Sequence, residues 1–348
     1  MKLVSILIAA YNAEKYFDEM LGSVRAQTYD NFEAWILDDG STDGTHAAAL
    51  RCAAADPRFK VVRWEQNRGV SDASFALFTL MRGEYWCRCD SDDVLHPDFL
   101  ARRVALLEAH PEAVMASGPP EIIRGDGEHG AATANPRPAI PANTRGADML
   151  RIMLQHNIIH TTSTLARASV TKTLMPFLRA EFRFAEDWYI WLLHFATGFD
   201  FLYDAAPAAK YRKHPANTSS KRDMFDARKA QIRLVPLVAL SAAAGFSATA
   251  RPLWARWRRV LWCNWLICAI RLALRGKLDP VWMASAAFAY HGAAVPRRRP
   301  AWRGLHLATV FANLPAIAWC KFAETRARRK TKYPVLGVAQ INDEIFNN

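Results

Sequence analysis

Three carboxylates stand within four residues at Asp90-Ser91-Asp92-Asp93. The aromatic and small residues at 83–89 are typical of a strand, and a helical pattern begins at Phe99. In an open α/β sheet, ligands bind at the carboxyl ends of the strands. Hard oxygen ligands at such a point suit Mg²⁺ or Mn²⁺, which can carry the phosphates of a nucleotide. The alternative for the cluster by itself is a capped, solvated turn.

The elements that must position this cluster alternate between strands and helices. The apolar run at 4–10 predicts a strand that is buried on both faces. The other strands are expected at 33–37, 59–64, 85–89 and 113–117. Helical spacing predicts helices at 13–26, 71–81 and 99–110, with another that ends near residue 55. This alternation implies an α/β fold with a mainly parallel sheet and right-handed crossovers.

The rest of the chain has a different pattern. Residues 118–146 are rich in Gly, Pro and Ala, which predicts a long loop. Helices are expected near 148–154 and at 186–197, followed by a short strand at 200–203. Beyond residue 223 the pattern is helical almost throughout. We therefore expect two parts, an α/β domain at 1–220 and a mostly helical region at 221–348.

The composition is that of a folded protein. Of the 348 residues, 51% are hydrophobic, which supports a core and argues against a disordered chain. Six cysteines are present, and their spacings fit no zinc-binding template. Since no secretory segment is seen ahead of the first strand, we expect buried, reduced thiols in a cytosolic protein.

The net charge of +12 is concentrated near the C-terminus. Residues 251–332 contain seventeen Lys or Arg and two acidic residues, a balance of +15, whereas the rest of the chain has a balance of −3. Such asymmetry indicates an anionic partner, either a membrane or a nucleic acid. No nucleic-acid recognition motif is found, so an anionic membrane surface is the expected partner.

Short motifs follow one another through the first 220 residues. They are Val4-Ser5-Ile6-Leu7-Ile8-Ala9-Ala10-Tyr11-Asn12, Gln27-Thr28-Tyr29, Asp38-Asp39-Gly40-Ser41-Thr42-Asp43, Asn67-Arg68-Gly69, Arg82-Gly83-Glu84-Tyr85, Asp90-Ser91-Asp92-Asp93, Pro97-Asp98, Glu186-Asp187-Trp188 and Tyr211-Arg212-Lys213-His214. In number, order and spacing this set resembles the family 2 glycosyltransferases. The resemblance implies a GT-A fold and an inverting enzyme that uses a nucleotide-sugar donor. Processive members such as cellulose and hyaluronan synthases are less similar, because no Gln-x-x-Arg-Trp follows Glu186-Asp187 and no clear membrane spans are visible.

On the donor side, the resemblance assigns nucleotide-sugar binding to Ala9, Tyr11, Asp39 and Asp90. Asp39 ends the second strand, where its carboxylate would accept the imide N–H of uracil; the alternative is a helix N-cap. Tyr11 would pack against the base, unless it is an ordinary core tyrosine. Asp90 would support the metal or hold the ribose.

Asp90 and Asp92 match the Asp-x-Asp motif of the family, and Asp92 is the expected ligand of a Mn²⁺ or Mg²⁺ cofactor that reaches the diphosphate. Asp93 is a second candidate metal ligand, because related sequences differ in how the cluster is used. His214 lies in Tyr-Arg-Lys-His and would reach the metal or the diphosphate, or else be structural.

On the acceptor side, Asp187 matches the Glu-Asp motif of the family, and its implied role is that of general base. Inversion requires one carboxylate to deprotonate the acceptor hydroxyl as it attacks C1 from the face opposite the diphosphate. The alternative is that Glu186 and Asp187 only stabilise a helix N-terminus. His160 lies in a segment that resembles the acceptor-side segment of the family, and with Glu186 it is a weaker acceptor candidate.

In the C-terminal third, a helical stripe carries apolar residues on one face, flanked by Arg256 and Arg259. The stripe consists of Trp254, Trp257, Leu261, Trp265, Cys268 and Leu272. Such a face suits a helix at a bilayer surface, or a helix packed on the first domain. Residues 305–323 have the length of a bilayer span but contain His306, Asn313, Pro315 and Lys321, and residues 326–332 form a polybasic run that fits anionic lipid.

Together these features predict a cytoplasmic glycosyltransferase that is peripheral on the inner face of the cell membrane. It would move one sugar from a UDP-sugar to a glycan or lipid-linked acceptor in cell-surface polysaccharide synthesis. One alternative is a nucleotidyltransferase of related fold, although Ala9-Ala10-Tyr11-Asn12 is not the Gly-rich loop of that class. Another is an inactive, membrane-bound scaffold, although Asp39, Asp92 and Asp187 are all present.

Overall fold

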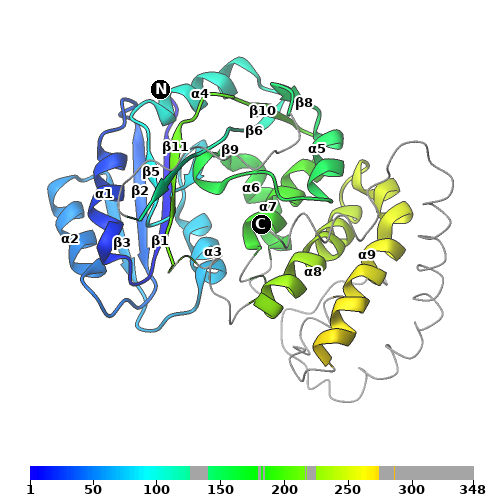
Figure 1. Ribbon diagram of the computed structural model, residues 1–348. Coiled ribbons are helices and arrows are strands. Elements are labelled where there is room, and N and C mark those ends of the chain that lie inside the picture. Colours follow the sequence, from blue (N-terminus) through cyan, green and yellow to red (C-terminus); the bar gives the residue numbers. More distant parts are fainter. Residues whose placement is uncertain are drawn as a thin grey trace. The chain divides into compact units, whose positions relative to one another are not determined.

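The computed structural model describes residues 1–125, 140–178, 182, 185–215, 217, 225–273 and 286 (Figure 1). The chain divides into two compact units, Met1–Lys221 and Arg222–Asn348. The first unit contains all the strands of the described residues, and the described part of the second is helical.

The main sheet of the first unit has eight strands in the order β3-β2-β1-β4-β9-β6-β10-β8 in the part of the chain that the structure describes. Their bounds are β1 (Val4–Ala10), β2 (Phe32–Asp38), β3 (Phe59–Arg63), β4 (Tyr85–Arg88), β6 (Ala113–Ser117), β8 (Asn143–Thr144), β9 (Leu165–Arg167) and β10 (Asp200–Tyr203). Strands β3, β2, β1 and β4 run parallel to one another. Strand β9 is antiparallel to both β4 and β6, β10 is parallel to β6, and β8 is antiparallel to β10.

Helices pack against this sheet through apolar side chains, and α7 (Glu186–Ala196) is buried on nearly all sides. The helices of the first unit are α1 (Glu14–Arg25), α2 (Thr45–Ala55), α3 (Val70–Leu80), α4 (Phe99–Ala109), α5 (Gly146–Met153), α6 (Ala168–Leu174) and α7 (Glu186–Ala196), with short 3₁₀ turns η1 (Thr161–Ser163) and η2 (Met175–Phe177). Helix α1 buries Phe17, Met20, Leu21 and Val24, which recur at helical spacing. Helices α1 and α2 lie on one side of β1 and β2, and α3 lies on the other (Figure 1). The chain therefore changes direction between β1 and β4, which is where open α/β sheets bind ligands.

A second, three-stranded sheet joins segments that are far apart in the sequence. It consists of β5 (Val94–Leu95), β11 (Ala209–Lys213) and β7 (Glu121–Arg124), with β11 in the middle. Strand β11 pairs with β5 in an antiparallel register, Ala209 opposite Leu95 and Lys210 opposite Val94. This pairing brings the end of β11 next to the acidic residues at 90–93.

The structure confirms the α/β fold class and the predicted strands near 4–10, 33–37, 59–64, 85–89, 113–117 and 200–203. The prediction of one long loop at 118–146 is wrong at both ends, because β7 and β8 lie there; residues 126–139 are outside the described part. Strands β5, β9 and β11 were not predicted. Strands β5 and β9 have two and three residues, too few to show a period of two, and only tertiary pairing defines them.

The second unit contains α8 (Phe225–Ala244) and α9 (Ala250–Ala273), which pack against each other. Trp254, Leu261, Trp265 and Leu272 of the predicted stripe are buried. Arg256 and Arg259 are exposed, as either interpretation of this helix requires. Residues 305–323 and 326–332 lie outside the described part of the chain. Within the described part, the structure has no helix that is both long enough and apolar enough to cross a bilayer.

Three of the cysteines are buried free thiols in the first unit, namely Cys52, Cys87 and Cys89. Burial raises the pKa of each of these thiols. They are therefore small apolar core residues, as the sequence predicted for the cysteines, and not reactive groups.

Candidate active site

The site forms where the chain leaves the carboxyl ends of β1, β2 and β4. Tyr11, directly after β1, is 49% exposed, so it is not a core tyrosine. Asn12 follows with φ 49°, a left-handed conformation that asparagine tolerates. The side-chain Oδ1 of Asn12 accepts the backbone N–H of Thr42 at 2.9 Å, which ties the loop after β1 to the loop after β2. Ala9 is half-buried within β1.

Asp39 lies at the end of β2 and is only 3% exposed. Its Oδ1 accepts the backbone N–H of Arg68 at 2.7 Å, and its Oδ2 accepts that of Gly69 at 2.8 Å. Gly69 has a φ of 98°, a backbone conformation that residues with a side chain rarely adopt. Helix α3 begins at the next residue. Asp39 therefore holds the turn before α3. Each carboxylate oxygen has a second lone pair, so this contact is compatible with a further N–H donor.

Asp93, in the loop between β4 and β5, is completely buried. Its Oδ2 accepts the hydroxyl of Thr162 at 2.6 Å, and its Oδ1 accepts the backbone N–H of Arg212 at 3.0 Å. Burial, together with the charges of Asp90 and Asp92, raises the pKa of Asp93 well above its usual range. Asp93 thus fixes the acidic loop to η1 and to β11, and this geometry does not favour it as a metal ligand.

Asp92 points to a different set of partners at the end of β11. Its Oδ2 lies 2.8 Å from Nε2 of His214 and accepts the side-chain amide of Asn217 at 3.1 Å. The side chain of Asp92 is 24% exposed, so ligand access is preserved. Burial and the neighbouring Asp90 raise the pKa of Asp92, and His214 opposes that shift.

Arg212 is a buried residue that contacts the backbone of the acidic loop. It was not expected from the sequence to be a site residue. It is 2% exposed; its Nε donates to the carbonyl of Asp92 at 2.9 Å, and its Nη2 donates to Glu19 at 2.6 Å. Its guanidinium also lies over the ring of Tyr16, 4.7 Å from the centroid. The sequence signal that could have indicated Arg212 is its position in Tyr-Arg-Lys-His, the motif in which His214 was expected to reach the metal or the diphosphate.

The Glu-Asp motif opens α7. The Oδ2 of Asp187 accepts the hydroxyl of Thr161 at 3.2 Å and the amide of Asn157 at 3.1 Å. Its Oδ1 accepts the backbone N–H of Trp188, the next residue of α7, at 2.7 Å. Asp187 remains half-buried, whereas Glu186 is 5% exposed and points into the protein.

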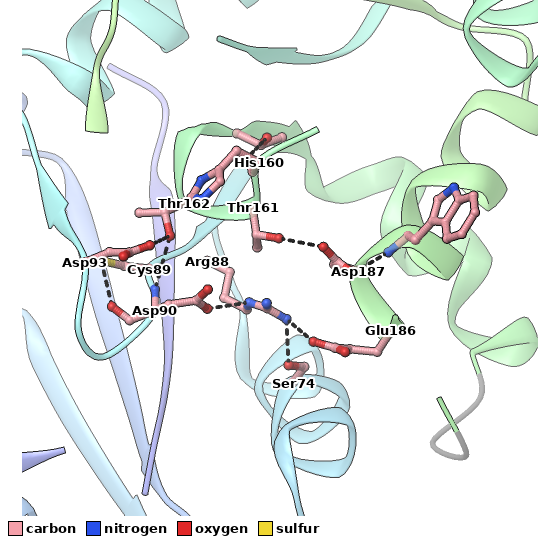
Figure 2. A network of polar contacts seen from close by, with 12 residues as sticks. Ser74, Arg88, Cys89, Asp90, Asp93, His160, Thr161, Thr162, Glu186 and Asp187 are labelled. Carbon is pink, nitrogen blue, oxygen red and sulfur yellow. Dashed lines mark hydrogen bonds and ion pairs between the residues drawn. The ribbon is translucent and has the colours of Figure 1, made fainter. Parts of the chain in front are cut away.

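Glu186 belongs to a buried polar network that reaches the acidic loop (Figure 2). Oε1 of Glu186 accepts Nη1 of Arg88 at 2.9 Å, and Nε of the same arginine donates to Oδ1 of Asp90 at 3.0 Å. Burial raises the pKa of Glu186 to about 7, with the charge of Arg88 opposing this shift and that of Asp187 adding to it. The two acidic motifs, predicted separately, therefore share one site.

A sequence profile described as Glycosyl transferase family 2 matches residues 5–174. An uncharacterized glycosyltransferase of Haemophilus influenzae is 30% identical over 226 residues, which are 63% of this chain and 68% of that protein. The chain belongs to glycosyltransferase family 2. A chondroitin synthase of Escherichia coli is 42% identical to this family 2 glycosyltransferase over 96 residues. These residues are 28% of this chain and 14% of the chondroitin synthase.

Among solved structures, Staphylococcus aureus TarS has the same fold as this family 2 glycosyltransferase. TarS residues 1–349 in complex with UDP superpose with a TM-score of 0.52 at 17% identity, covering 84% of this chain and 88% of that one. The complex of TarS with UDP-GlcNAc gives a TM-score of 0.53 at 16% identity, with 84% and 89% coverage. These likenesses agree with the expected GT-A fold.

His160, a predicted acceptor-side residue, also lies near the acidic loop. Its ring packs against Tyr211 with centroids 4.7 Å apart, and the next two residues, Thr161 and Thr162, bond to Asp187 and Asp93. Within the described ranges, no group of three or more His, Cys, Asp or Glu side chains is arranged to hold a metal ion. Arg88 and Asn217 were not among the site residues expected from the sequence. Arg88, a charge between two cysteines of a buried strand, was a usable signal.

Proposed function

We propose that this glycosyltransferase transfers a single sugar from a UDP-sugar to an acceptor hydroxyl, with inversion and with a divalent cation. The observation that carries the proposal is the role of η1. Thr162 bonds to Asp93 of the acidic loop at 2.6 Å, and the adjacent Thr161 bonds to Asp187 at 3.2 Å. Two neighbouring residues thus fix the distance between the donor-side loop and the candidate base.

Asp187 is the proposed general base. The acceptor oxygen attacks C1 of the sugar, the bond from C1 to the diphosphate oxygen breaks, and the diphosphate leaves with the nucleotide. The proton of the acceptor hydroxyl passes to the carboxylate of Asp187. Two hydrogen bonds from Asn157 and Thr161 hold Oδ2 in place, which limits the reorganisation needed for proton transfer.

Asp92 and His214 fit a Mn²⁺ or Mg²⁺ ion. The carboxylate oxygen of Asp92 lies 2.8 Å from the imidazole nitrogen of His214, and a carboxylate is the donor type that suits Mn²⁺ and Mg²⁺. Such ions commonly bind to one or two protein carboxylates together with substrate phosphates, so a complete protein cage is not required. When bound, the ion would neutralise charge on the leaving diphosphate. Asp90 has 37% of its side chain exposed, and it would hold the ribose or support the ion.

The donor and the acceptor are proposed from the relatives. UDP and UDP-GlcNAc are the ligands of the TarS complexes, which supports a UDP-sugar donor here, with Asp39 and Tyr11 around the base. The similarity to a chondroitin synthase supports a glycan or lipid-linked acceptor and a role in cell-surface polysaccharide synthesis. Membership of glycosyltransferase family 2 speaks against the alternative of a nucleotidyltransferase. The presence of Asp39, Asp92 and Asp187 speaks against an inactive scaffold.

We further propose that the enzyme acts at the cytoplasmic face of an anionic membrane. Four arginines of α9 are exposed, namely Arg251, Arg256, Arg258 and Arg259. Helix α9 contains no Asp or Glu. Trp254 and Trp265 of the stripe are buried, so the proposed contact is electrostatic and does not depend on their insertion.

The experiment that tests the transfer is a screen of UDP- and GDP-sugars by release of the nucleoside diphosphate, with Mn²⁺, Mg²⁺ or EDTA. We expect release from one UDP-sugar above all others, dependent on the cation and stimulated by a glycan acceptor. Equal release of the nucleoside diphosphate in EDTA would contradict the proposed metal dependence. A preference for a GDP-sugar would contradict the proposed UDP-sugar donor, and no release from any donor would contradict the proposed catalytic activity.

A further inference from the structure

Arg88 is the last residue of β4, and it lies between the donor side and the acceptor side of the site (Figure 2). Its side chain is 9% exposed. Nε donates to Oδ1 of Asp90 at 3.0 Å, and Nη1 donates to Oε1 of Glu186 at 2.9 Å and to the hydroxyl of Ser74 at 3.3 Å. One guanidinium therefore serves two carboxylates that are 96 residues apart in the sequence.

This arrangement depends on arginine. The planar guanidinium carries several N–H donors in fixed directions, whereas a lysine ammonium is a single point charge. A buried polar group that loses its hydrogen-bond partner is destabilising, so Arg88 and Glu186 each depend on the other. Asp90 is more exposed, and its orientation therefore depends on the direction in which Arg88 is held.

We propose that Arg88 is a positioning residue that couples donor binding at Asp90 to the acceptor side at Glu186. Glu186 orients the guanidinium, and the guanidinium orients Asp90. The inference deepens the proposed function and rests on it, since it assumes that Asp90 contacts the donor. It assigns Glu186 a role different from the one expected from the sequence, because the buried carboxylate acts through Arg88 and not by contact with the acceptor.

A consequence follows that neither residue alone would give. Replacing Glu186 should weaken nucleotide binding, although Glu186 belongs to the acceptor-side motif. Because both substitutions break the same chain of contacts, their effects should not add when they are combined. A purely structural role would lower stability and leave the affinity of the folded protein unchanged.

The test is calorimetric titration of the full chain with UDP and Mn²⁺. The variants are Arg88→Gln, Arg88→Lys, Glu186→Gln and the double variant Arg88→Gln with Glu186→Gln. The matched control is Arg167→Gln. Arg167 is the last residue of β9 and lies opposite Tyr85, at the start of β4. Arg167 also makes partly buried contacts, to Tyr85 and to the carbonyls of Leu107, His110 and Ala113, but among the described residues it has none with the acidic motifs.

We expect the dissociation constant for UDP to rise by about 5-fold or more in Arg88→Gln and in Glu186→Gln, which is the lower end of typical coupling between sites. The double variant should bind as weakly as Arg88→Gln and no weaker. Arg88→Lys should fall between wild type and Arg88→Gln, and Arg167→Gln should bind like wild type.

Wild-type affinity in Glu186→Gln would overturn the inference, as would effects of the two substitutions that add. If Arg88→Gln does not fold, as judged by circular dichroism, Arg88→Lys and Glu186→Gln still decide. A wild-type chain that binds no nucleoside diphosphate at all would contradict the proposed function itself. If instead wild type binds UDP and the variants bind it with the same affinity, only the proposed coupling is contradicted.

Discussion

Oδ2 of Asp92 and Nε2 of His214 lie 2.8 Å apart, although 122 residues separate them in the sequence. The pairing of β11 with β5 creates this contact, because β5 follows the acidic loop directly and His214 follows β11. Asn217 then bonds to the same oxygen of Asp92 at 3.1 Å. A carboxylate and an imidazole thus share a partly exposed position, where a cation would replace their mutual hydrogen bond.

Asp92→Ala should abolish metal-dependent binding of the UDP-sugar and leave the fold intact, because Asp92 is the proposed cation ligand and is partly exposed. Calorimetry with and without Mn²⁺ measures this. Asp98→Ala is the control, since Asp98 is an exposed carboxylate of the same segment that pairs with Arg102. Unchanged nucleotide-sugar affinity in Asp92→Ala would show that Asp92 is not the ligand.

Asp187→Asn should lower kcat by about 10²–10⁴-fold, because it keeps the shape of the side chain and removes the proton acceptor. Donor affinity should change little, since the base faces the acceptor. Steady-state kinetics with varied donor and acceptor give both quantities. Asp148→Asn is the matched control, because Asp148 is likewise an acid in the first turn of a helix, α5, and pairs with Arg151. A variant that keeps more than roughly a tenth of wild-type kcat would mean that another group takes the proton.

Asp93→Ala should destabilise the protein by about 1–3 kcal/mol, because the hydroxyl of Thr162 and the backbone N–H of Arg212 lose a buried acceptor. Urea unfolding of wild type and variant measures the difference. Asp92→Ala, at a partly exposed position in the same loop, should cost less. The opposite outcome, normal stability with loss of metal-dependent binding, would return Asp93 to the metal site.

Glu186 should make stability depend on pH. Its pKa is raised from 4.5 to about 7, so the folded protein holds this proton more tightly than the unfolded chain does. The resulting stabilisation is present below pH 4.5 and is lost as the pH rises through about 7. A shift of this size corresponds to about 3 kcal/mol.

Thermal or urea unfolding of wild type and Glu186→Gln from pH 4.5 to 8 checks this prediction. Other groups titrate in both proteins and cancel, and the Gln side chain does not titrate. The free energy of unfolding of wild type, relative to the variant, should therefore decrease with rising pH and level off above pH 7. A difference that stays constant over this range would mean that Arg88 keeps Glu186 ionised throughout.

The full chain should float with anionic liposomes at low salt. Each basic residue near an anionic leaflet gains about 1 kcal/mol, within a Debye length of about 8 Å. The four exposed arginines of α9 would together give about 4 kcal/mol. Replacing Arg251, Arg256, Arg258 and Arg259 by Gln should reduce flotation, as should high salt, and neutral liposomes are the control. No flotation of wild type with anionic liposomes at low salt would refute the membrane contact.

The sequence by itself determined the order of the elements and the family. An apolar run such as 4–10 is buried on both faces because its only polar side chain, Ser5, is small and bonds to the buried Glu33, and β1 follows that run. Carboxylates that end strands, such as Asp39 and Asp90, were expected at one edge because parallel strands end on the same side of a sheet. Local composition and spacing carry this information.

Only the tertiary structure decided what each carboxylate touches. Asp92 and Asp93 are neighbours in the chain, yet successive side chains point in different directions, and one meets His214 while the other is buried against Thr162 and Arg212. The bridge from Asp90 through Arg88 to Glu186 joins segments that no local pattern relates. Such contacts depend on strand order and on the packing of α7, and these are set by long-range burial and not by local spacing.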